Sequence, residues 1–318
     1  MRHLLRTLRT TLVLRAIELL GPRRRRVVGW RALVGAGVRD VTFERDGLVW
    51  TVSPEDGPVA FGLFTDGAYH GAEIRALADW MAQSGVLSAT RDVIVDAGAH
   101  VGSTCIPLVR ATGGRALAIE PVAESFRRLE ANVAANGLAD RITRVRAAVA
   151  RDAGRATMRV EARQSGASFV RRQHRDTGRD APDDRSPPEE VDGLPLGALL
   201  ASAGVRPDEV ALVWADVQGS EADVIESGAA LWALGVPLWA EVEPHSLALQ
   251  GSLARFAALA AEHFDRFIES RDLLRDGSAA RPAPIAALSD LMQRIGPGEM
   301  NTDVLFLPPR LGGSRGPA

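Results

Sequence analysis

Short apolar runs alternate with amphipathic stretches along most of the chain, and this alternation predicts its secondary structure. Continuous apolar runs of roughly four to eight residues are typical of strands buried on both faces of a sheet. Apolar residues three and four positions apart are typical of helices that cover such a sheet. The predicted strands are 92–97, 116–119, 142–149, 210–215, 238–242, 264–268 and 304–307. Helices are predicted between them at 106–109, 122–136, 224–234, 253–261 and 287–295.

The repeated order of strand, helix and strand indicates a parallel sheet with helices on both faces. The expected fold is therefore α/β, with a Rossmann-like, doubly wound, seven-stranded and mostly parallel sheet. Upstream, the short apolar runs of residues 41–64 are broken by turn residues and predict a small antiparallel β element, and residues 71–87 have helical spacing. We expect residues 1–88 to form a basic helix and a small α+β cap, and residues 89–318 to form the main domain.

Residues 162–191 depart from this pattern. Arg, Asp, Pro, Gly and Ser dominate the segment, and hardly any apolar residue follows Val170. Such a segment cannot bury enough apolar surface to offset the entropy lost on ordering. It is predicted to be a flexible loop, with a lid over a substrate as the alternative.

The first thirty residues contain a partly apolar stretch, Leu12 to Leu20, that follows several arginines as in an export signal. Arg15 and Glu18 interrupt it, no small-residue cleavage site follows, and Arg23 to Arg26 come instead. The stretch is also much shorter than the roughly 20 residues that cross a bilayer. We therefore expect a basic helix that is solvated or packs on the domain. Contact with a membrane surface is the less favoured alternative.

Charge and cysteine content narrow the range of partners and compartments. The chain has 38 basic and 40 acidic residues and a net charge of −2, so it has no overall field that would attract nucleic acid. Its single cysteine, Cys105, excludes an internal disulfide and fits a reducing compartment. A cytoplasmic location and a partner other than nucleic acid are expected.

A glycine-rich loop follows the first predicted strand of the main domain and contains Asp96, Gly98, His100 and Gly102. Glycines let the backbone turn sharply and approach a ligand, which in open α/β sheets binds at the carboxyl ends of the strands. A dinucleotide loop has the pattern G-x-G-x-x-G, whose middle glycine admits the pyrophosphate, but His100 stands at that position. The loop therefore disfavours a pyrophosphate and suits the smaller methionine moiety of S-adenosylmethionine.

Glu120 and Pro121 end the second strand, about twenty residues after the loop. A nucleoside-binding fold places a carboxylate there to accept hydrogen bonds from the ribose hydroxyls. Pro121 then stops the strand and lets the next helix begin. We assign both residues to the cofactor site, with a surface charge at the strand end as the alternative for Glu120.

Asp216 follows the apolar strand 210–215, and Gly219 allows a tight entry into the next helix. Asp216 is expected to project from the strand end into the crevice that holds the cofactor, where a catalytic group belongs. Enzymes that methylate amino groups of nucleic acids carry an Asn/Asp-Pro-Pro-aromatic motif at this place, and this chain lacks it. The difference argues against methylation of a nucleic-acid base.

Glu241, Glu243 and His245 follow the fifth predicted strand. Because side chains alternate along a strand, Glu241 and Glu243 share one face and could both meet Asp216. Carboxylates are ligands for hard divalent cations, but this set is not closely spaced, and we predict no metal. His245 is a second candidate for the general base because its ordinary pKa is near neutral. Asp216, Glu241 and His245 are thus the catalytic candidates.

These segments together resemble the FkbM-type family of class I S-adenosylmethionine-dependent methyltransferases. The family pattern is similar to an Asp-x-Gly-Ala-Asn-x-Gly loop, a Glu-Pro pair, an Asp-Val-Glu-Gly-x-Glu block and a Glu that ends the next strand. The matching segments are 96–102, Glu120-Pro121, 216–221 and Glu241, within about residues 90–245. The resemblance implies S-adenosylmethionine as methyl donor, and commonly O-methylation of saccharides or natural products.

Two positions depart from the family pattern: His100 replaces the usual Asn, and Gln218 the usual Glu. His100 is expected either to bind the carboxylate of the cofactor or to cap the backbone of the following helix. The expected function is O-methylation of a small-molecule or saccharide acceptor. The alternatives are an inactive protein that binds S-adenosylmethionine as a sensor or partner, which only Gln218 supports, and a nicotinamide-dependent oxidoreductase, which the loop spacing disfavours.

Overall fold

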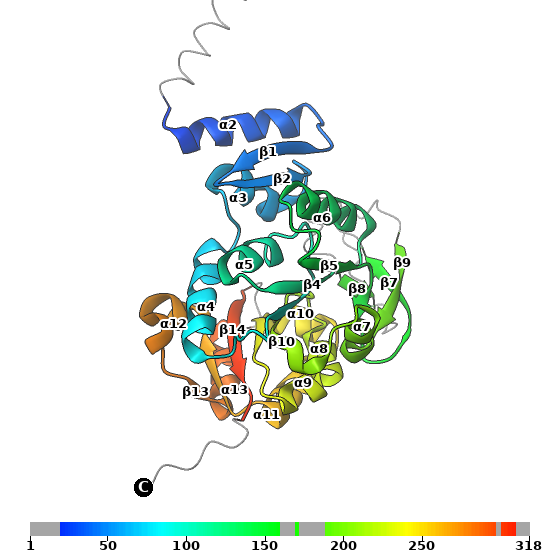
Figure 1. Cartoon of the computed structure of the whole chain (residues 1–318), viewed down its shortest axis with the longest axis vertical. Helices are drawn as coiled ribbons and strands as arrows, with labels where there is room; N and C mark the ends of the chain where they lie inside the picture. Colours follow the sequence, from blue (N-terminus) through cyan, green and yellow to red (C-terminus); the bar gives the residue numbers. More distant parts are fainter. Residues whose placement is uncertain (1–19, 160–168, 172–187, 297–299, 310–318) are drawn as a thin grey trace, which may run out of the picture.

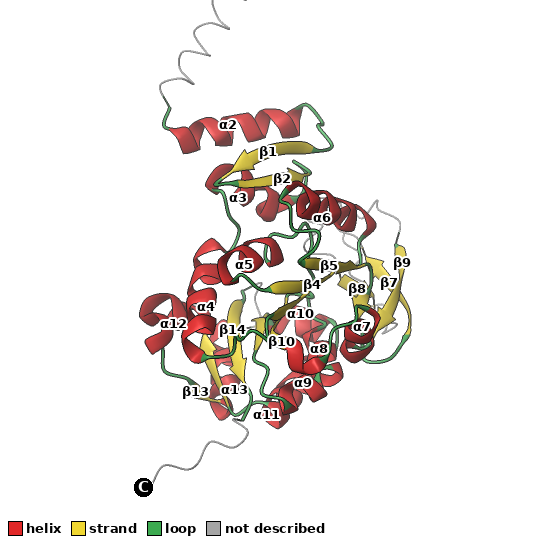
Figure 2. Ribbon diagram, in the orientation of Figure 1, coloured by secondary structure: helices red, strands yellow, loops and turns green. Residues whose placement is uncertain are grey.

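The structure is a computed structural model that describes residues 20–159, 169–171, 188–296 and 300–309. Its centre is a sheet of eight strands with helices on both faces (Figures 1 and 2). The strands are β3 (Val93–Ala97), β4 (Arg115–Ile119), β5 (Ile142–Val145), β10 (Val210–Ala215), β11 (Leu238–Val242), β12 (Arg266–Glu269), β13 (Ala283–Pro284) and β14 (Thr302–Leu307). Their order in space is β13-β12-β14-β11-β10-β3-β4-β5.

Each of the seven predicted strands contributes a strand to this sheet, and the Rossmann-like α/β class is confirmed. Strands β5, β4, β3, β10 and β11 run parallel, whereas β14 is antiparallel to both of its neighbours. The eighth strand, β13, has two residues and is too short to show a pattern in the sequence. The prediction of one strand over 142–149 is wrong: β5 ends at Val145, and β6 (Ala148–Val149) pairs in a different sheet.

Two hydrophobic cores lie on the two faces of the sheet. Along β3, Ile94 belongs to one core and Val95 to the other, as the alternation of side chains along a strand requires. One core is covered by α4 (Gly71–Ser84), α5 (Cys105–Thr112), α6 (Ala123–Ala135) and α12 (Ser270–Asp276). The other is covered by α7 (Leu196–Ser202), α8 (Glu221–Ser227), α9 (Ala229–Ala233), α10 (Pro244–Leu249), α11 (Leu253–His263) and α13 (Leu288–Ile295).

The predicted helix 224–234 is two helices, α8 and α9, separated at Gly228. The ring of Trp232 fills the space beside this glycine, where a Cβ atom would lie 2.5 Å from Cζ2 of the indole. The Trp232 Nε1–H donates to the carbonyl of Ile225 at 2.7 Å. The break between the two helices therefore leaves room for the buried ring of Trp232. Trp214 and Trp239 are buried too, at 3% and 1% exposure, and belong to the core.

A second, four-stranded sheet lies beyond β5 with the order β6-β9-β7-β8. Its further strands are β7 (Gly154–Arg159), β8 (Phe169–Arg171) and β9 (Glu189–Leu194). Most of the predicted loop 162–191 lies outside the described residues, and its described parts form β8 and the beginning of β9. The polar composition of these edge strands gave no signal of a sheet.

The N-terminal cap consists of α2 (Pro22–Gly35), β1 (Val41–Arg45), β2 (Leu48–Val52) and α3 (Gly57–Asp66). The predicted antiparallel element is present as the β1-β2 hairpin, but its extension to Phe64 is wrong because Phe61 and Phe64 lie in α3. Pro58 in the first turn of α3 presets a helical φ. The predicted apolar stretch from Leu12 lies almost entirely outside the described residues. No helix in the described ranges is long and apolar enough to cross a membrane.

Two asparagines one helical turn apart join the cap to the main sheet. Asn132 and Asn136 on α6 accept hydrogen bonds from the backbone N–H groups of Thr51 and Val49, at 2.6 and 2.9 Å. Their amide Nδ2 groups donate to the carbonyls of the same residues at 3.1 and 2.7 Å. The two amides therefore continue the ladder of β2 as a neighbouring strand would, and they fix the cap above α6 (Figure 1).

Candidate active site

The candidate residues gather where the carboxyl ends of β3, β4, β10 and β11 meet the beginning of β14. Asp216 lies directly beside the glycine-rich loop: its N–H donates to the carbonyl of Ala97 at 3.0 Å. Gly98 has a φ of +87°, and a Cβ atom there would lie 2.0 Å from the carbonyl oxygen of Asp216. Only glycine permits this approach. Backbone contacts therefore hold the glycine-rich loop against Asp216, the candidate catalytic residue.

Asp96 lies under the loop with its side chain buried. Its Oδ2 accepts the N–H of Cys105 at 3.0 Å and so holds the first residue of α5. Burial raises the pKa of Asp96 to about 7. Oδ1 has no hydrogen-bond partner among the described residues. Asp96 therefore shapes the loop with one oxygen and keeps the other as an unused acceptor.

Gly102 also has a positive φ, +89°, but its missing side chain would point into the core. A Cβ atom there would lie 2.7 Å from Cδ1 of Ile106 and 3.0 Å from Cδ1 of Leu129. A substitution at this glycine would disturb core packing as well as the loop. It is thus a poor probe of ligand binding, although the residue shapes the loop.

Glu120 closes the loop from the side of β4. Its Oε2 accepts the N–H of His100 and its Oε1 accepts the N–H of Val122, both at 2.8 Å. The residue is 5% exposed, and burial raises its pKa to about 7 against the effect of His100 and the two backbone donors. Each carboxylate oxygen can accept a second hydrogen bond, so Glu120 retains capacity for a ligand. Pro121 follows, and its carbonyl accepts Nε of Arg146 at 3.2 Å.

The side chain of His100 makes a contact that neither alternative drawn from the sequence included. Its Nε2 lies 2.8 Å from Oδ2 of Asp56, a residue of the cap that directly precedes α3, and both side chains are buried. Burial lowers the pKa of His100, but the carboxylate of Asp56 outweighs burial, so the net shift is upward. His100 is also in the left-handed region, with a φ of +50°. The cap therefore holds the glycine-rich loop through a buried ion pair.

Gln218 joins two of the catalytic candidates. Its amide Nε2 donates to Oδ1 of Asp216 at 2.6 Å and to Oε2 of Glu241 at 3.1 Å. The other carboxylate oxygen of Glu241 accepts Nδ2 of Asn301 at 2.5 Å. A glutamate in place of Gln218 would bring a third carboxyl group here. The amide instead supplies the donor that two neighbouring carboxylates need.

Burial shifts the pKa values of the two carboxyl groups that Gln218 joins, those of Asp216 and Glu241. Burial and the neighbouring carboxylates, Asp216 first among them, raise the pKa of Glu241 to about 10. Burial also raises the pKa of Asp216, but the hydrogen bond from Gln218 and the charges of His70 and His100 oppose the rise. Glu241 is therefore protonated at neutral pH, and its amide partner Gln218 couples it to Asp216. The pair titrates as a unit.

Three residues at this edge were missed by the sequence analysis: Tyr69, His70 and Asp303. Nδ1 of His70 lies 3.8 Å from Oδ2 of Asp303, and the His70 ring packs edge-on against Tyr69 at 4.2 Å. Burial and nearby carboxylates raise the pKa of Tyr69 to about 12, so its hydroxyl stays protonated. Tyr69 and His70 precede α4, far from β14 in the sequence, and only the folded chain brings them together.

The remaining candidates lie at the margin. His245 is in the first turn of α10, and its side chain makes no hydrogen bond or ion pair with the described residues. Glu243 accepts the hydroxyl of Ser246 at 2.5 Å. Among the residues that the structure describes, no three His, Cys, Asp or Glu side chains are arranged to hold a metal ion. Asp216 and Glu241 are thus the catalytic candidates that the fold brings together.

A comparison with known protein families identifies the family of this chain. The model of the methyltransferase FkbM domain matches residues 96–271, which is more than half of the chain and includes every candidate from Asp96 to His245. The chain belongs to the FkbM methyltransferase family. It is therefore a member of the class I S-adenosylmethionine-dependent methyltransferases, as its motifs implied.

Solved structures of methyltransferases are similar to this FkbM-family chain only at a distance. An O-methyltransferase from Bacillus cereus in complex with SAH has a TM-score of 0.41 and 11% identity, over 76% of this chain and 80% of that one. A geranyl diphosphate C-methyltransferase from Streptomyces coelicolor has a TM-score of 0.37 and 10% identity, over 74% and 76% of the two chains. No curated protein matches the sequence. Likenesses this distant carry no information about the methyl acceptor.

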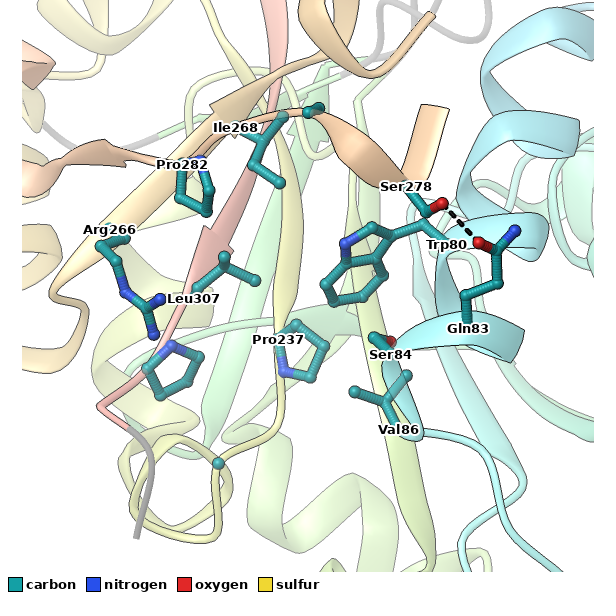
Figure 3. A pocket seen from close by; sticks show the side chains of 13 residues that line it. Trp80, Gln83, Ser84, Val86, Pro237, Arg266, Ile268, Ser278, Pro282 and Leu307 are labelled. Atoms are coloured by element: carbon teal, nitrogen blue, oxygen red, sulfur yellow. Dashed lines mark hydrogen bonds between the residues drawn. The ribbon is translucent and has the colours of Figure 1, made fainter. Parts of the chain in front are cut away.

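A cavity of about 500 Å³ lies at the opposite edge of the sheet (Figure 3). It is lined by Pro237, which precedes β11, by Arg266 at the beginning of β12 and by Leu307 at the end of β14. Trp80 of α4 forms one wall. Because the candidate residues cluster at the other ends of these strands, this cavity is separate from the candidate active site.

The buried carboxylates predict how stability depends on pH. Asp96, Glu120 and Glu221 each have a pKa raised by burial to about 7, whereas in an unfolded chain they lose their protons near pH 4. The folded state therefore binds more protons than the unfolded state between these values, and the free energy of unfolding falls as pH rises through the window. We expect the melting temperature to decrease from pH 5.5 to pH 8.5. A melting temperature that increases over this range would contradict the assigned shifts.

Proposed function

We propose that this FkbM-family chain transfers a methyl group from S-adenosylmethionine to a hydroxyl group of a saccharide or another natural product. One observation carries the proposal: the backbone of Asp216 is fixed against the glycine-rich loop, by the hydrogen bond to Ala97 and the close contact at Gly98. A carboxylate on that backbone stands beside the place where the loop would hold the methyl donor. Such an arrangement suits the removal of a proton from an acceptor during transfer.

The residues present fit S-adenosylmethionine as the cofactor. S-adenosylmethionine supplies an electrophilic methyl group on a positively charged sulfur. The buried Asp96 Oδ1 has no partner among the described residues, and Glu120 can accept one more hydrogen bond at each oxygen. These acceptors match the hydroxyl and ammonium donors of the cofactor. The loop from Gly98 to Gly102 lies between them and would hold the methionine end.

The chain's own residues would divide the acid–base work. Asp216 accepts the proton of the acceptor hydroxyl, and Gln218 orients it through the 2.6 Å hydrogen bond to Oδ1. Glu241, protonated at neutral pH, shares the amide of Gln218 without adding a second charge. Gln218 was the only sequence feature in favour of a binding-only protein, and in this geometry it positions the base. His245 remains the second candidate for that role.

The charge of the site favours a neutral acceptor. Glu241 is protonated at neutral pH, so the negative charge at this edge of the sheet comes from the proposed base Asp216 and, above its pKa of about 7, from Asp303. This charge opposes an acceptor that carries phosphate or carboxylate. Polyhydroxyl compounds such as saccharides can donate hydrogen bonds to these oxygens. The same negative charge disfavours nucleic acid as the acceptor. The buried Trp214 and Trp239 offer no open face for stacking on a sugar, so recognition would rest on hydrogen bonds.

The proposal is tested with S-adenosylmethionine that carries a tritiated methyl group. The purified chain is incubated with a panel of neutral saccharides, polyketide alcohols and phosphorylated sugars, and label transferred to each acceptor is counted. We expect transfer to neutral hydroxyl compounds and little to the phosphorylated ones. Transfer confined to amines, carboxylates or phosphorylated acceptors would contradict the proposal of a neutral hydroxyl acceptor.

Glu120→Gln tests the cofactor site. The substitution keeps the shape but turns an amide NH2 toward one of the two backbone N–H donors, of His100 or Val122, and removes the charge. A charge-assisted hydrogen bond contributes about 1.5 to 3 kcal/mol, so we expect the Kd for S-adenosylmethionine to rise roughly ten- to a hundredfold. Glu130→Gln, on the exposed face of α6, is the matched control. A change below twofold at Glu120 with a folded protein would remove it from the cofactor site.

A further inference from the structure

The helix α2 lies at one end of the molecule, on the far side of the β1-β2 hairpin from the main sheet (Figure 1). One face of it packs on the cap: Trp30 is 6% exposed, and its ring lies 6.2 Å from Phe61 and 5.2 Å from Phe64. Arg23 and Arg26 also turn toward α3, where Arg23 pairs with the carboxylate of Asp66 and Arg26 donates to a backbone carbonyl. This face of α2 therefore contacts α3 and stabilises the cap.

The opposite face of α2 is basic and has no acidic partner among the residues that the structure describes. Arg24, Arg25, Val28 and Arg31 are exposed, and their spacing puts them on one side of the helix. Arg25 donates only to the carbonyl of Leu20, and Arg24 and Arg31 make no ion pair or hydrogen bond with the described residues. These four residues form what we call the basic face of α2. A cluster of exposed arginines without acidic partners among the described residues can pair with the phosphates of an anionic membrane surface.

The N-terminal end of the chain, which contains α2, is much more basic than the rest. The first 40 residues contain ten arginines and two acidic residues, although the whole chain has a net charge of −2. The remainder of the chain therefore has an excess of acidic residues. A negatively charged surface would attract the N-terminal end and repel the rest, which orients the molecule.

We propose that the basic face of α2 docks the protein on an anionic membrane surface. Its arginines pair with lipid phosphates, and Val28, which is 37% exposed, enters the headgroup region. The helix lies on the surface and does not cross the bilayer, in agreement with the lack of a spanning helix in the described ranges. An extended nucleic acid is the less suitable partner, because it would lie along the acidic remainder of the chain, which repels it.

The test is sedimentation of the full chain with vesicles of phosphatidylcholine, with or without phosphatidylserine at about a third of the lipid. We expect binding to the anionic vesicles only, and its loss at high salt because the attraction is screened. In the triple variant Arg24→Gln, Arg25→Gln, Arg31→Gln, each lost arginine weakens binding about fivefold, so the three together weaken it about a hundredfold. The control variant Arg206→Gln, Arg271→Gln, Arg275→Gln has the same change in net charge at exposed positions elsewhere and should bind as the wild type does.

Three results would overturn the proposal. The first is binding of the triple variant that equals that of the control variant, at matched melting temperatures. The second is equal binding to neutral and anionic vesicles. The third is tight binding to heparin or RNA without binding to vesicles, which would assign the basic face to a different polyanion. None of these results depends on methyl transfer, so the docking proposal stands or falls apart from the proposed function.

Discussion

Replacing Asp216 with asparagine is expected to slow methyl transfer about 10²- to 10⁴-fold, the range for a lost acid–base group, while S-adenosylmethionine still binds within a fewfold. Asparagine keeps the shape of the side chain and its bond to Gln218 but removes the charge and the basic oxygen. The backbone contacts to Ala97 and Gly98 are unaffected, so the loop is preserved. Single-turnover transfer and equilibrium binding on one preparation separate the two effects.

The pH profile adds a second readout for Asp216. Its pKa is raised by burial, so the wild-type rate should fall as pH decreases through a value above that of an ordinary aspartate. This acidic limb should be absent from the residual activity of Asp216→Asn. His245→Gln is the companion variant, because His245 is the other candidate for the base. Wild-type transfer by Asp216→Asn together with a large loss in His245→Gln would move the assignment to His245.

Replacing Asp56 with alanine is expected to lower the free energy of unfolding by about 3 to 5 kcal/mol, because it breaks a buried ion pair and leaves the charge of His100 without this partner. The Nε2 to Oδ2 distance is 2.8 Å, and the two side chains are 8% and 4% exposed. Denaturant unfolding measures the loss. Since His100 also donates its N–H to Glu120, we expect weaker binding of S-adenosylmethionine as well.

A double-mutant cycle shows whether the effect belongs to the pair. His100→Asn introduces the residue that the family usually has at this position and removes the buried imidazolium. The double variant Asp56→Ala, His100→Asn should therefore be more stable than Asp56→Ala alone. Additive losses in the cycle would show that the two side chains do not stabilise each other and that the cap is held to the loop by other contacts.

Much of the fold follows from local pattern, as the strands around the site show. Buried parallel strands are continuous apolar runs, so β10 and β11 were predicted to the residue. The failures have physical causes. The helix α3 was misassigned because its short apolar stretch, with Phe61 and Phe64, fits a strand as well as a helix. Residues 142–149 lack a turn signal such as Gly or Pro, although the chain divides them between two sheets as β5 and β6.

The site was predictable where function imposes a local motif and unpredictable where it depends on distant contacts. The loop of Gly98 and the strand-end Asp216 stand beside each other as their positions required. Asp56 carries no such signal, because it becomes a partner of His100 only when the cap folds onto the loop. Asp303 likewise reaches the cluster on a strand that comes last in the sequence.

The central claim is that the loop beside Asp216 holds S-adenosylmethionine, and calorimetric titration of the purified chain tests it most directly. We expect one molecule of S-adenosylmethionine to bind per chain, S-adenosylhomocysteine to compete for the same site and Glu120→Gln to weaken both. NAD should give no heat of binding, because His100 takes the place of the glycine that admits a pyrophosphate. Binding of NAD, or no binding of S-adenosylmethionine to the folded wild-type chain, would contradict the account.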